Sequence, residues 1–333
     1  MCYRSRRSAA WGRWASQNGV RQQEGRRRPD VPSIAGCFWR CGSIEMDNIG
    51  NQKIWAYFDE NVESRPATNL AIRGGDGHTV KSYFELAKKV AELQFRNRDH
   101  VLLFRGQARD HLTIKGNTSL KASLFRLNDR ITLTDKTLEE RFLQLVSAEA
   151  ELVRRYAKSK FLGYQRLKRH RILRWAILQH YEVCLTPLLD VTHSLRIAAS
   201  FASLGKVDSM AFIFVLGVPN LSGAITASSE AGLQIVRLSS VCPPDAIRPH
   251  VQEGYLVGEY PEIADFNQTS KYSQHEMDFG RRLVAKFRFD PSKFWDAPNY
   301  TPVPVDALYP KGHRDLLLDI CDEIQKKINS GGK

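Results

Sequence analysis

Long hydrophobic runs are missing from this 333-residue sequence. A membrane-spanning helix needs about 18 consecutive apolar residues, whereas the longest apolar candidates here are the short segments 198–202 and 210–216. The N-terminal region also lacks the apolar core of a secretory signal, because it is interrupted by Arg4, Arg6, Arg7 and Arg13. We therefore expect a cytoplasmic protein that does not contact membranes.

The short motifs that define common nucleotide-binding and nucleophilic enzymes are missing as well. The segment Gly74-Gly75-Asp76-Gly77 has neither the Lys-Ser/Thr pair of a P-loop nor a long strand before it, so it predicts a turn. The chain also lacks a dinucleotide-binding Gly-x-Gly-x-x-Gly, and no Gly-x-Ser-x-Gly or Cys/His pairing indicates a nucleophile. Any enzymatic chemistry must therefore come from another arrangement.

Cysteine gives little indication of a disulfide framework or a zinc site. The six cysteines are scattered, and only Cys37 and Cys41 lie close together. This pair has no second pair or nearby histidines, so we expect free thiols in a reducing compartment. The spacing of His180, Asp190 and His193 matches no established ligand motif, and we expect no bound metal.

Nearly half of the net charge of +13 lies near the N-terminus. Residues 1–45 hold nine arginines and no lysine against Glu24, Asp30 and Glu45, a net charge of +6 that leaves +7 for the rest. Such a bias is typical of translation upstream of a true start, which would be Met46; the alternative is a disordered basic arm that binds nucleic acid. We expect residues 46–333 to form one domain.

The remaining sequence, 42% apolar and 26% charged over the whole chain, has the patterns of a globular α/β or α+β protein. Three- and four-residue apolar spacing predicts helices, and short apolar runs predict strands. A capping box is indicated at Thr137 and Glu140. The predicted helices are 79–95, 137–158, 160–181, 196–204 and 314–328, and the predicted strands are 100–104, 210–216, 234–238 and 251–256.

One predicted helix is unusually basic. Its charges suit phosphate contacts with a nucleic acid, although a solvated helix face gives the same pattern. The residues concerned are Lys160, Arg166, Lys168, Arg169, Arg171 and Arg174.

Three separated segments together resemble the FRG domain family, named for a tripeptide found here at Phe104-Arg105-Gly106. The first segment continues through Gln107 to residues 119–126, and the second runs from Gln179-His180-Tyr181 to residues 188–202. The third runs from Arg248 to Tyr255, within which Gln252-Glu253-Gly254-Tyr255 matches a Gln-x-Gly-aromatic pattern. The resemblance covers about residues 79–260. The family's Gly and Pro-Thr-Arg are replaced by Glu182 and Leu185-Thr186-Pro187, which affects the loop in the second segment.

The same layout is similar, more distantly, to ADP-ribosyltransferases, which implies an α+β fold with a split mixed β-sheet and flanking helices. The resemblance implies that Arg105 grips the pyrophosphate of NAD, since a guanidinium is always charged and bonds two oxygens at once. Thr192 would hold the nicotinamide ribose, and Asp190 would orient that hydroxyl. Gln107, His180, Tyr181 and Phe201 are further candidates for NAD binding, the last two as an aromatic wall.

The resemblance to ADP-ribosyltransferases implies that Gln252 takes the place of the residue that assists cleavage of the glycosidic bond. Positive charge builds up on the ribose during cleavage, and a carboxylate stabilises it better than an amide. Glu253 is adjacent, but neighbouring side chains of a strand point to opposite faces, so Glu253 would need a bulge to turn inward.

Two functions therefore remain open for this chain. One is an NAD-dependent ADP-ribosyltransferase that modifies a nucleic acid or a protein in a bacterial defence or toxin setting. In such an enzyme Arg105, Thr192 and Gln252 would meet at one cleft. The other is a non-catalytic module that binds nucleic acid or protein. Each residue also has a structural interpretation: Arg105 could bridge to Asp190, and His180 could be a hydrogen-bonded, partly buried histidine.

Overall fold

The computed structural model describes residues 49, 53–57, 63–126, 133–204, 210–295, 300–310 and 315–330. The chain divides into two units, Met1–Ile44 and Glu45–Lys333, and all described residues belong to the second. The expectations for the basic tail and for a start at Met46 fall outside the described residues. No described helix is both long and apolar enough to span a membrane.

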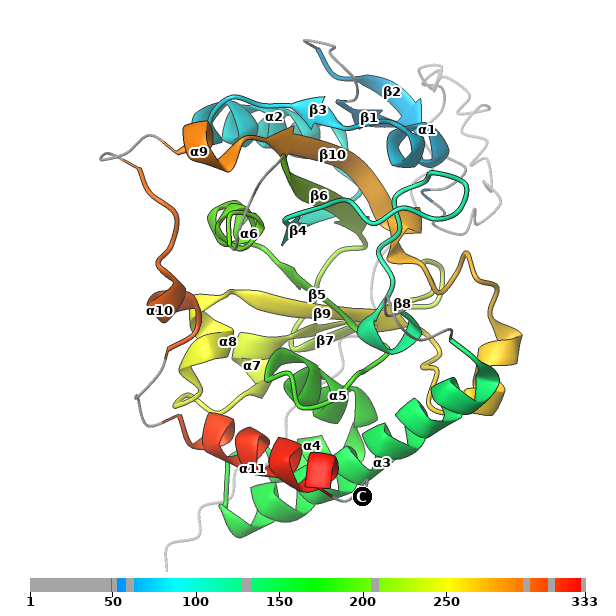
Figure 1. Ribbon diagram of the computed structural model, residues 1–333, viewed down its shortest axis with the longest axis vertical. Coiled ribbons are helices and arrows are strands. Elements are labelled where there is room, and N and C mark those ends of the chain that lie inside the picture. Colours follow the sequence, from blue (N-terminus) through cyan, green and yellow to red (C-terminus); the bar gives the residue numbers. More distant parts are fainter. Residues whose placement is uncertain are drawn as a thin grey trace, which may run out of the picture. The chain divides into compact units, whose positions relative to one another are not determined.

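A mixed β-sheet organises the described part of this unit (Figure 1). Its eight strands follow the order β3-β10-β6-β4-β5-β9-β8-β7, in which only β3 and β10 run parallel. A separate hairpin consists of β1 (Lys53–Ala56) and β2 (Arg65–Thr68). The strands of the large sheet are β3 (His78–Thr79), β4 (Val101–Gln107), β5 (Leu189–Thr192), β6 (Ala211–Val218), β7 (Ile225–Ser228), β8 (Leu233–Arg237), β9 (Gly254–Glu259) and β10 (Leu283–Phe289).

The sheet is nearly divided in the middle, between β4 and β5. β4 pairs with β6 along seven residues and β5 pairs with β9 along four, but β4 and β5 share the single pair Phe104↔Thr192. The α+β class and the mixed sheet expected from the sequence are thus present.

Helices cover both halves of the sheet. In Figure 1, α2 lies beside β3 and β10, while α3, α5 and α11 form a layer next to the half that contains β5 and β9. The helices are α1 (Asn69–Gly74), α2 (Tyr83–Arg96), α3 (Asp135–Lys158), α4 (Tyr164–Arg169), α5 (Arg171–His180), α6 (Leu195–Ala202), α7 (Leu238–Val241), α8 (Ile247–Val251), α9 (Pro291–Phe294), α10 (Val305–Leu308) and α11 (Leu316–Ser330), with short 3₁₀ turns η1 (Ser123–Phe125), η2 (Phe266–Lys271) and η3 (Phe279–Arg282).

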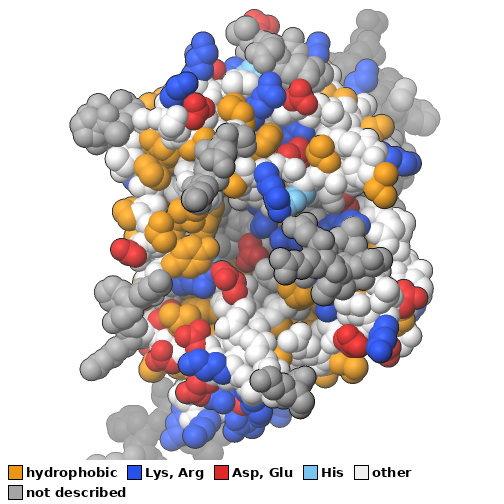
Figure 2. Space-filling model, viewed as in Figure 1, with side chains coloured by type: hydrophobic (Ala, Val, Ile, Leu, Met, Phe, Trp, Pro, Cys, Tyr) orange, Lys and Arg blue, Asp and Glu red, His pale blue; other side chains and the backbone are white. Residues whose placement is uncertain are grey.

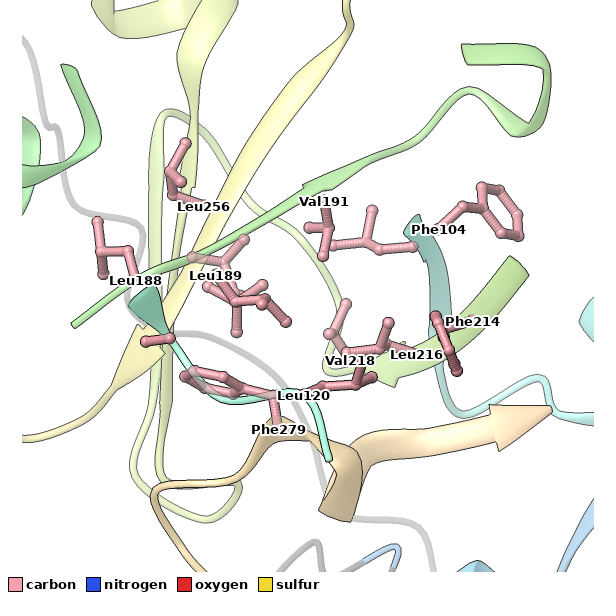
Figure 3. Packing of buried hydrophobic residues seen from close by; sticks show 14 of the residues in the cluster. Phe104, Leu120, Leu188, Leu189, Val191, Phe214, Leu216, Val218, Leu256 and Phe279 are labelled. Atoms are coloured by element: carbon pink, nitrogen blue, oxygen red, sulfur yellow. The ribbon is translucent and has the colours of Figure 1, made fainter. Parts of the chain in front are cut away.

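The hydrophobic core continues across the division of the sheet. Leu216 and Val218 of β6 lie near Leu189 of β5 and beside Leu120 and Phe279 (Figure 3). All five side chains are at most 2% exposed. Apolar burial therefore ties the two halves together where backbone pairing does not.

Several predicted boundaries are wrong for local reasons. The expected capping box at Thr137 is absent, because the helix begins earlier and the Thr134 hydroxyl accepts the Thr137 amide at 3.2 Å. The helix expected over 160–181 is broken at His170, whose backbone is extended. Arg174 satisfies the carbonyls left at that break by donating to Leu167 and Lys168.

The strand predicted to end at Phe104 runs on to Gln107, because Arg105, Gly106 and Gln107 continue to pair with β6. Arg105 is therefore inside a strand rather than at its end. The predicted helix over 79–95 begins only at Tyr83, since Ser82 caps it through the Glu85 amide.

Because Gly106 has no side chain, the backbone of helix α6 packs directly against the backbone of β4. A Cβ built on Gly106 would lie 1.8 Å from the Ala198 carbonyl oxygen and 2.9 Å from the Ala202 nitrogen. Backbone atoms cannot give way as a flexible side chain can, so any larger residue must push α6 off the sheet. The glycine of the tripeptide is a packing requirement.

We expect Gly106→Ala to destabilise the protein by about 3 kcal/mol, the upper part of the usual range for overpacking. For a domain of this size the melting temperature should fall by roughly 6–12 °C. Thermal unfolding followed by circular dichroism measures the shift.

Gly74→Ala is the matched control. A Cβ there would meet only the Asn117 side-chain oxygen at 3.2 Å, and Gly74 lies in a helix that alanine favours. Equal melting temperatures for the two variants would contradict the proposed role of Gly106.

Candidate functional site

A pocket of about 300 Å³ opens where β4 and β5 part. Figure 2 shows the corresponding face hollowed near its middle, with basic and acidic side chains inside the hollow. Three strands, three helices and the segment after α10 contribute to its wall. The lining residues are Phe104, Arg105, Gly106, His180, Asp190, Val191, Thr192, Phe201, Leu204, Arg248, Gln252, Tyr255 and Tyr309.

Arg105 enters this pocket from β4. Its Nη1 donates to the Asp190 backbone carbonyl at 2.5 Å, so the guanidinium bridges the two strands where their backbones no longer pair. Its Nε is buried and has no hydrogen-bond partner. Burial and the neighbouring Arg126 lower the pKa of Arg105 to about 10, while Asp190 opposes the change. The side chain is thus still charged at neutral pH.

Asp190 faces the same pocket from β5 and is held by hydrogen bonds. Its carboxylate accepts from Gln179 Nε2 at 2.7 Å, and Gln179 Oε1 in turn accepts from Ser123 and Thr186. Burial raises the pKa of Asp190, and Arg105 and the Gln179 bond oppose that rise. The expected bridge between Arg105 and Asp190 exists, but it uses the aspartate's backbone rather than its carboxylate.

Thr192 and Gln252 both line the pocket, and hydrogen bonds connect their segments. The Thr192 hydroxyl donates to the Gln252 carbonyl at 2.8 Å and accepts the Ser194 amide at 3.0 Å. The Gln252 side chain donates to the Leu308 carbonyl at 2.8 Å. Both side chains therefore already hold the walls of the site together.

The strand predicted over 251–256 is wrong at its start. Gln252 is the C-cap of α8, and β9 begins only at Gly254. Glu253, between them, has a left-handed backbone with φ 45°, and its carbonyl accepts the His193 amide. Its side chain is exposed and lies outside the pocket lining. The turn brings the Glu253 backbone, not its carboxylate, toward the site.

His180 is buried at the end of α5, and its Nε2 has no hydrogen-bond partner. A hydrogen bond to the Arg248 backbone favours the charged form of the ring. Burial first, and the nearby Arg248 charge second, lower the pKa of His180 well below 6.5. The imidazole is therefore neutral at pH 7.

The other predicted binding residues divide into two groups. Phe201 lines the pocket from α6. Tyr181 does not, because its hydroxyl donates to buried Asp315 at 3.0 Å and anchors the start of α11 instead. Gln107 also lies outside the lining, and its buried Oε1 has no partner.

Sequence reasoning missed three residues of this site. Arg248, from α8, stacks its guanidinium 4.6 Å from the Tyr309 ring and also binds exposed Glu182 at 2.6 Å. Tyr255 and Tyr309 complete the aromatic wall. Arg248 opened the third segment of the family resemblance and could have been selected, whereas Tyr309 has no sequence signal because it lies beyond that resemblance.

More positive than negative side chains line the pocket. Arg105 and Arg248 line it against the single lining carboxylate of Asp190, and the positive charge of Arg126 reaches Arg105. Both lining arginines carry a buried Nε without a partner. Buried donors normally find acceptors, so this arrangement suits an anionic ligand such as a phosphate group. Among the described residues no group of three or more His, Cys, Asp or Glu could hold a metal ion.

The basic stretch of the sequence is only partly available to a partner. Arg174 binds buried Glu149 at 2.7 Å and Arg171 approaches the same carboxylate at 3.5 Å. The remaining four side chains, Lys160, Arg166, Lys168 and Arg169, are exposed.

The FRG domain matches residues 100–209 of this chain, about a third of its length. The matched region contains Arg105, His180 and Asp190, but not the α8–β9 segment with Arg248 and Gln252. No curated protein and no solved structure matches the chain.

Thr192→Val should remove the hydroxyl that joins the Gln252 carbonyl and the Ser194 amide. Leaving two buried backbone groups without partners costs about 1–3 kcal/mol, which thermal or urea unfolding measures. Thr192→Ser keeps the hydroxyl and should recover most of that stability. A serine variant as unstable as the valine variant would show that the methyl group, not the hydrogen bonds, matters here.

Proposed function

We propose that this FRG-domain protein binds NAD in the pocket between β4 and β5 and transfers ADP-ribose to a macromolecule. The observation that supports the proposal is that Arg105, whose buried Nε has no hydrogen-bond partner, lines the same pocket as Thr192 and Gln252, although the three residues are far apart in sequence. A volume of about 300 Å³ is within the range of small-molecule sites.

In this proposal the two lining arginines hold the pyrophosphate of NAD. Arg105 is fixed through the Asp190 carbonyl and Arg248 is stacked on Tyr309, so both guanidinium groups are positioned before the ligand arrives. Fixed donors bind a phosphate at a lower entropic cost than mobile ones. Their charge also attracts a phosphate from solution.

Aromatic side chains suit the ring systems of the nucleotide. Phe201, Tyr255 and Tyr309 line the pocket from three different segments, and flat rings pack well against a nicotinamide or adenine face. These three residues form the aromatic wall for which the sequence suggested Tyr181 and Phe201.

Asp190 is the carboxylate best placed to stabilise the positive charge that develops on the ribose. It lines the pocket, whereas the Glu253 side chain does not and the Gln252 amide is engaged by Leu308. A carboxylate near the sugar lowers the cost of breaking the glycosidic bond. A bacterial toxin or defence setting is part of this proposal through the resemblance to ADP-ribosyltransferases.

Calorimetric titration of the full chain with NAD tests the binding step. We expect saturable binding that weakens about 10- to 150-fold in Arg105→Ala, because a hydrogen bond to a charged group contributes about 1.5–3 kcal/mol. Glu253→Ala is the matched control, since its side chain is exposed outside the pocket. Absence of binding by the wild-type protein at millimolar NAD would refute the proposal.

A second candidate function, nucleic-acid binding, is favoured by the exposed basic side chains on and beside α4. Phosphate contacts make affinity fall log-linearly with salt. We expect the triple reversal Arg166→Glu, Lys168→Glu and Arg169→Glu to weaken RNA retention at low salt at least tenfold. The control variant replaces three lysines that are exposed elsewhere, Lys53, Lys81 and Lys88, with glutamate, and so changes the net charge by the same amount. If both triple variants retain RNA equally, the basic side chains of α4 form only a solvated helix face.

A further inference from the structure

The two arginines of the pocket differ in what already binds them. A guanidinium holds a phosphate best through two parallel hydrogen bonds, and the edge formed by Nε and Nη2 can supply both. In Arg105 the Asp190 carbonyl lies at Nη1, outside this edge. In Arg248 the Glu182 carboxylate accepts from Nη2 at 2.6 Å, while Nε has no partner. Glu182 therefore fills half of the edge with which Arg248 would hold an anion.

The side chain of Glu182 can leave this contact at a low cost. It is 65% exposed, whereas the Arg248 side chain is 12% exposed. An ion pair with one partner in water contributes little, a factor of about 1.4 to 5 in an equilibrium constant. An anion that binds Arg248 more strongly than this will displace the carboxylate.

The backbone of Glu182, in contrast, is fixed. Its φ is 58°, a left-handed conformation that is uncommon for a residue with a side chain. Its amide donates to the Gln179 carbonyl at 3.0 Å, and its carbonyl accepts from Gln325 of α11 at 2.8 Å. The carboxylate is thus tethered beside Arg248, and a tethered group competes at a high effective concentration.

Arg248 keeps its place without Glu182. Its guanidinium lies 4.6 Å from the centre of the Tyr309 ring and 5.8 Å from that of Tyr181, both within the range of a cation–π contact. Tyr181 is buried and donates its hydroxyl hydrogen to Asp315. The cation therefore remains at the pocket when the carboxylate moves away.

We propose that Glu182 is an internal competitor for the anion site of Arg248, whose carboxylate occupies the guanidinium until the pyrophosphate of NAD displaces it. The inference rests on the proposed function and adds the residue that limits the affinity of the site. The phosphate charges make displacement necessary, because a pyrophosphate and a carboxylate on the same edge of one guanidinium repel each other. A ligand that also binds Arg105 gains enough to displace Glu182, whereas a small anion held by Arg248 alone is disfavoured.

Calorimetric titration of the full chain with NAD, comparing wild type with Glu182→Gln, tests the competition. Glutamine has the same shape without the charge, so it competes less strongly for Nη2. We expect NAD to bind about two- to fivefold more tightly to the variant, up to the factor that a surface ion pair contributes. Glu253→Gln is the matched control and should bind NAD as wild type does, because Glu253 is also an exposed glutamate with a left-handed backbone.

The outcomes separate this inference from the proposed function. A gain of less than twofold in Glu182→Gln would overturn the competition and leave NAD binding in place, and weaker binding would mean that Glu182 positions Arg248 for the ligand instead. If the wild-type protein does not bind NAD, the proposed function fails and inorganic pyrophosphate becomes the probe. Pyrophosphate binding at least twofold tighter in the variant supports the competition, and equal binding, or none to either protein, overturns it.

A second variant keeps the test decisive if Glu182→Gln does not fold. Glycine adopts a left-handed backbone without steric cost, so Glu182→Gly should fold and keep the turn. It removes the carboxylate entirely, and the same gain in affinity is expected.

Discussion

The parting of β4 from β5 after one residue pair is the constraint on which the site depends. Beyond Phe104↔Thr192 the two strands stop exchanging backbone hydrogen bonds, and the Arg105 guanidinium reaches across to the Asp190 carbonyl instead. On β4, Gly106 has no side chain, which allows the backbone of α6 to pack directly against the strand. A continuous sheet would leave no pocket, and a bulkier residue at 106 would displace the wall that carries Phe201 and Leu204.

The pocket contains polar atoms that a purely structural core would avoid. Each buried group without a partner costs about 1–3 kcal/mol, and Arg105, His180 and Arg248 each contribute one such atom to the same cavity. Proteins are stable by only about 5–15 kcal/mol, so three of these in one place are a substantial cost. A bound ligand that forms hydrogen bonds with these atoms would remove this cost.

Elsewhere the charged side chains mainly hold the fold. Glu149 binds Arg174 and the Trp175 ring nitrogen, and Glu151 joins α3 to α11 through Lys327. The Tyr181 hydroxyl binds Asp315 and fixes the start of α11, after the segment that brings Tyr309 to the pocket. Several basic side chains are thus paired within the fold, whereas Arg105 and Arg248 each have a buried Nε without a hydrogen-bond partner.

The sequence by itself determined the elements with strong local patterns: the long helix over α3, the buried strands β4 and β6, and the tripeptide whose arginine and glycine shape the site. It also singled out Thr192 and Gln252, since family-like segments are local in the chain. Only the tertiary structure decided that Glu253 turns outward, that Tyr181 anchors α11, and that Arg248 and Tyr309 belong to the pocket. These depend on a left-handed turn and on contacts between residues such as Tyr181 and Asp315, 134 positions apart. Periodicity carries no information about such contacts, because it reports which face of an element is buried and not what that face meets.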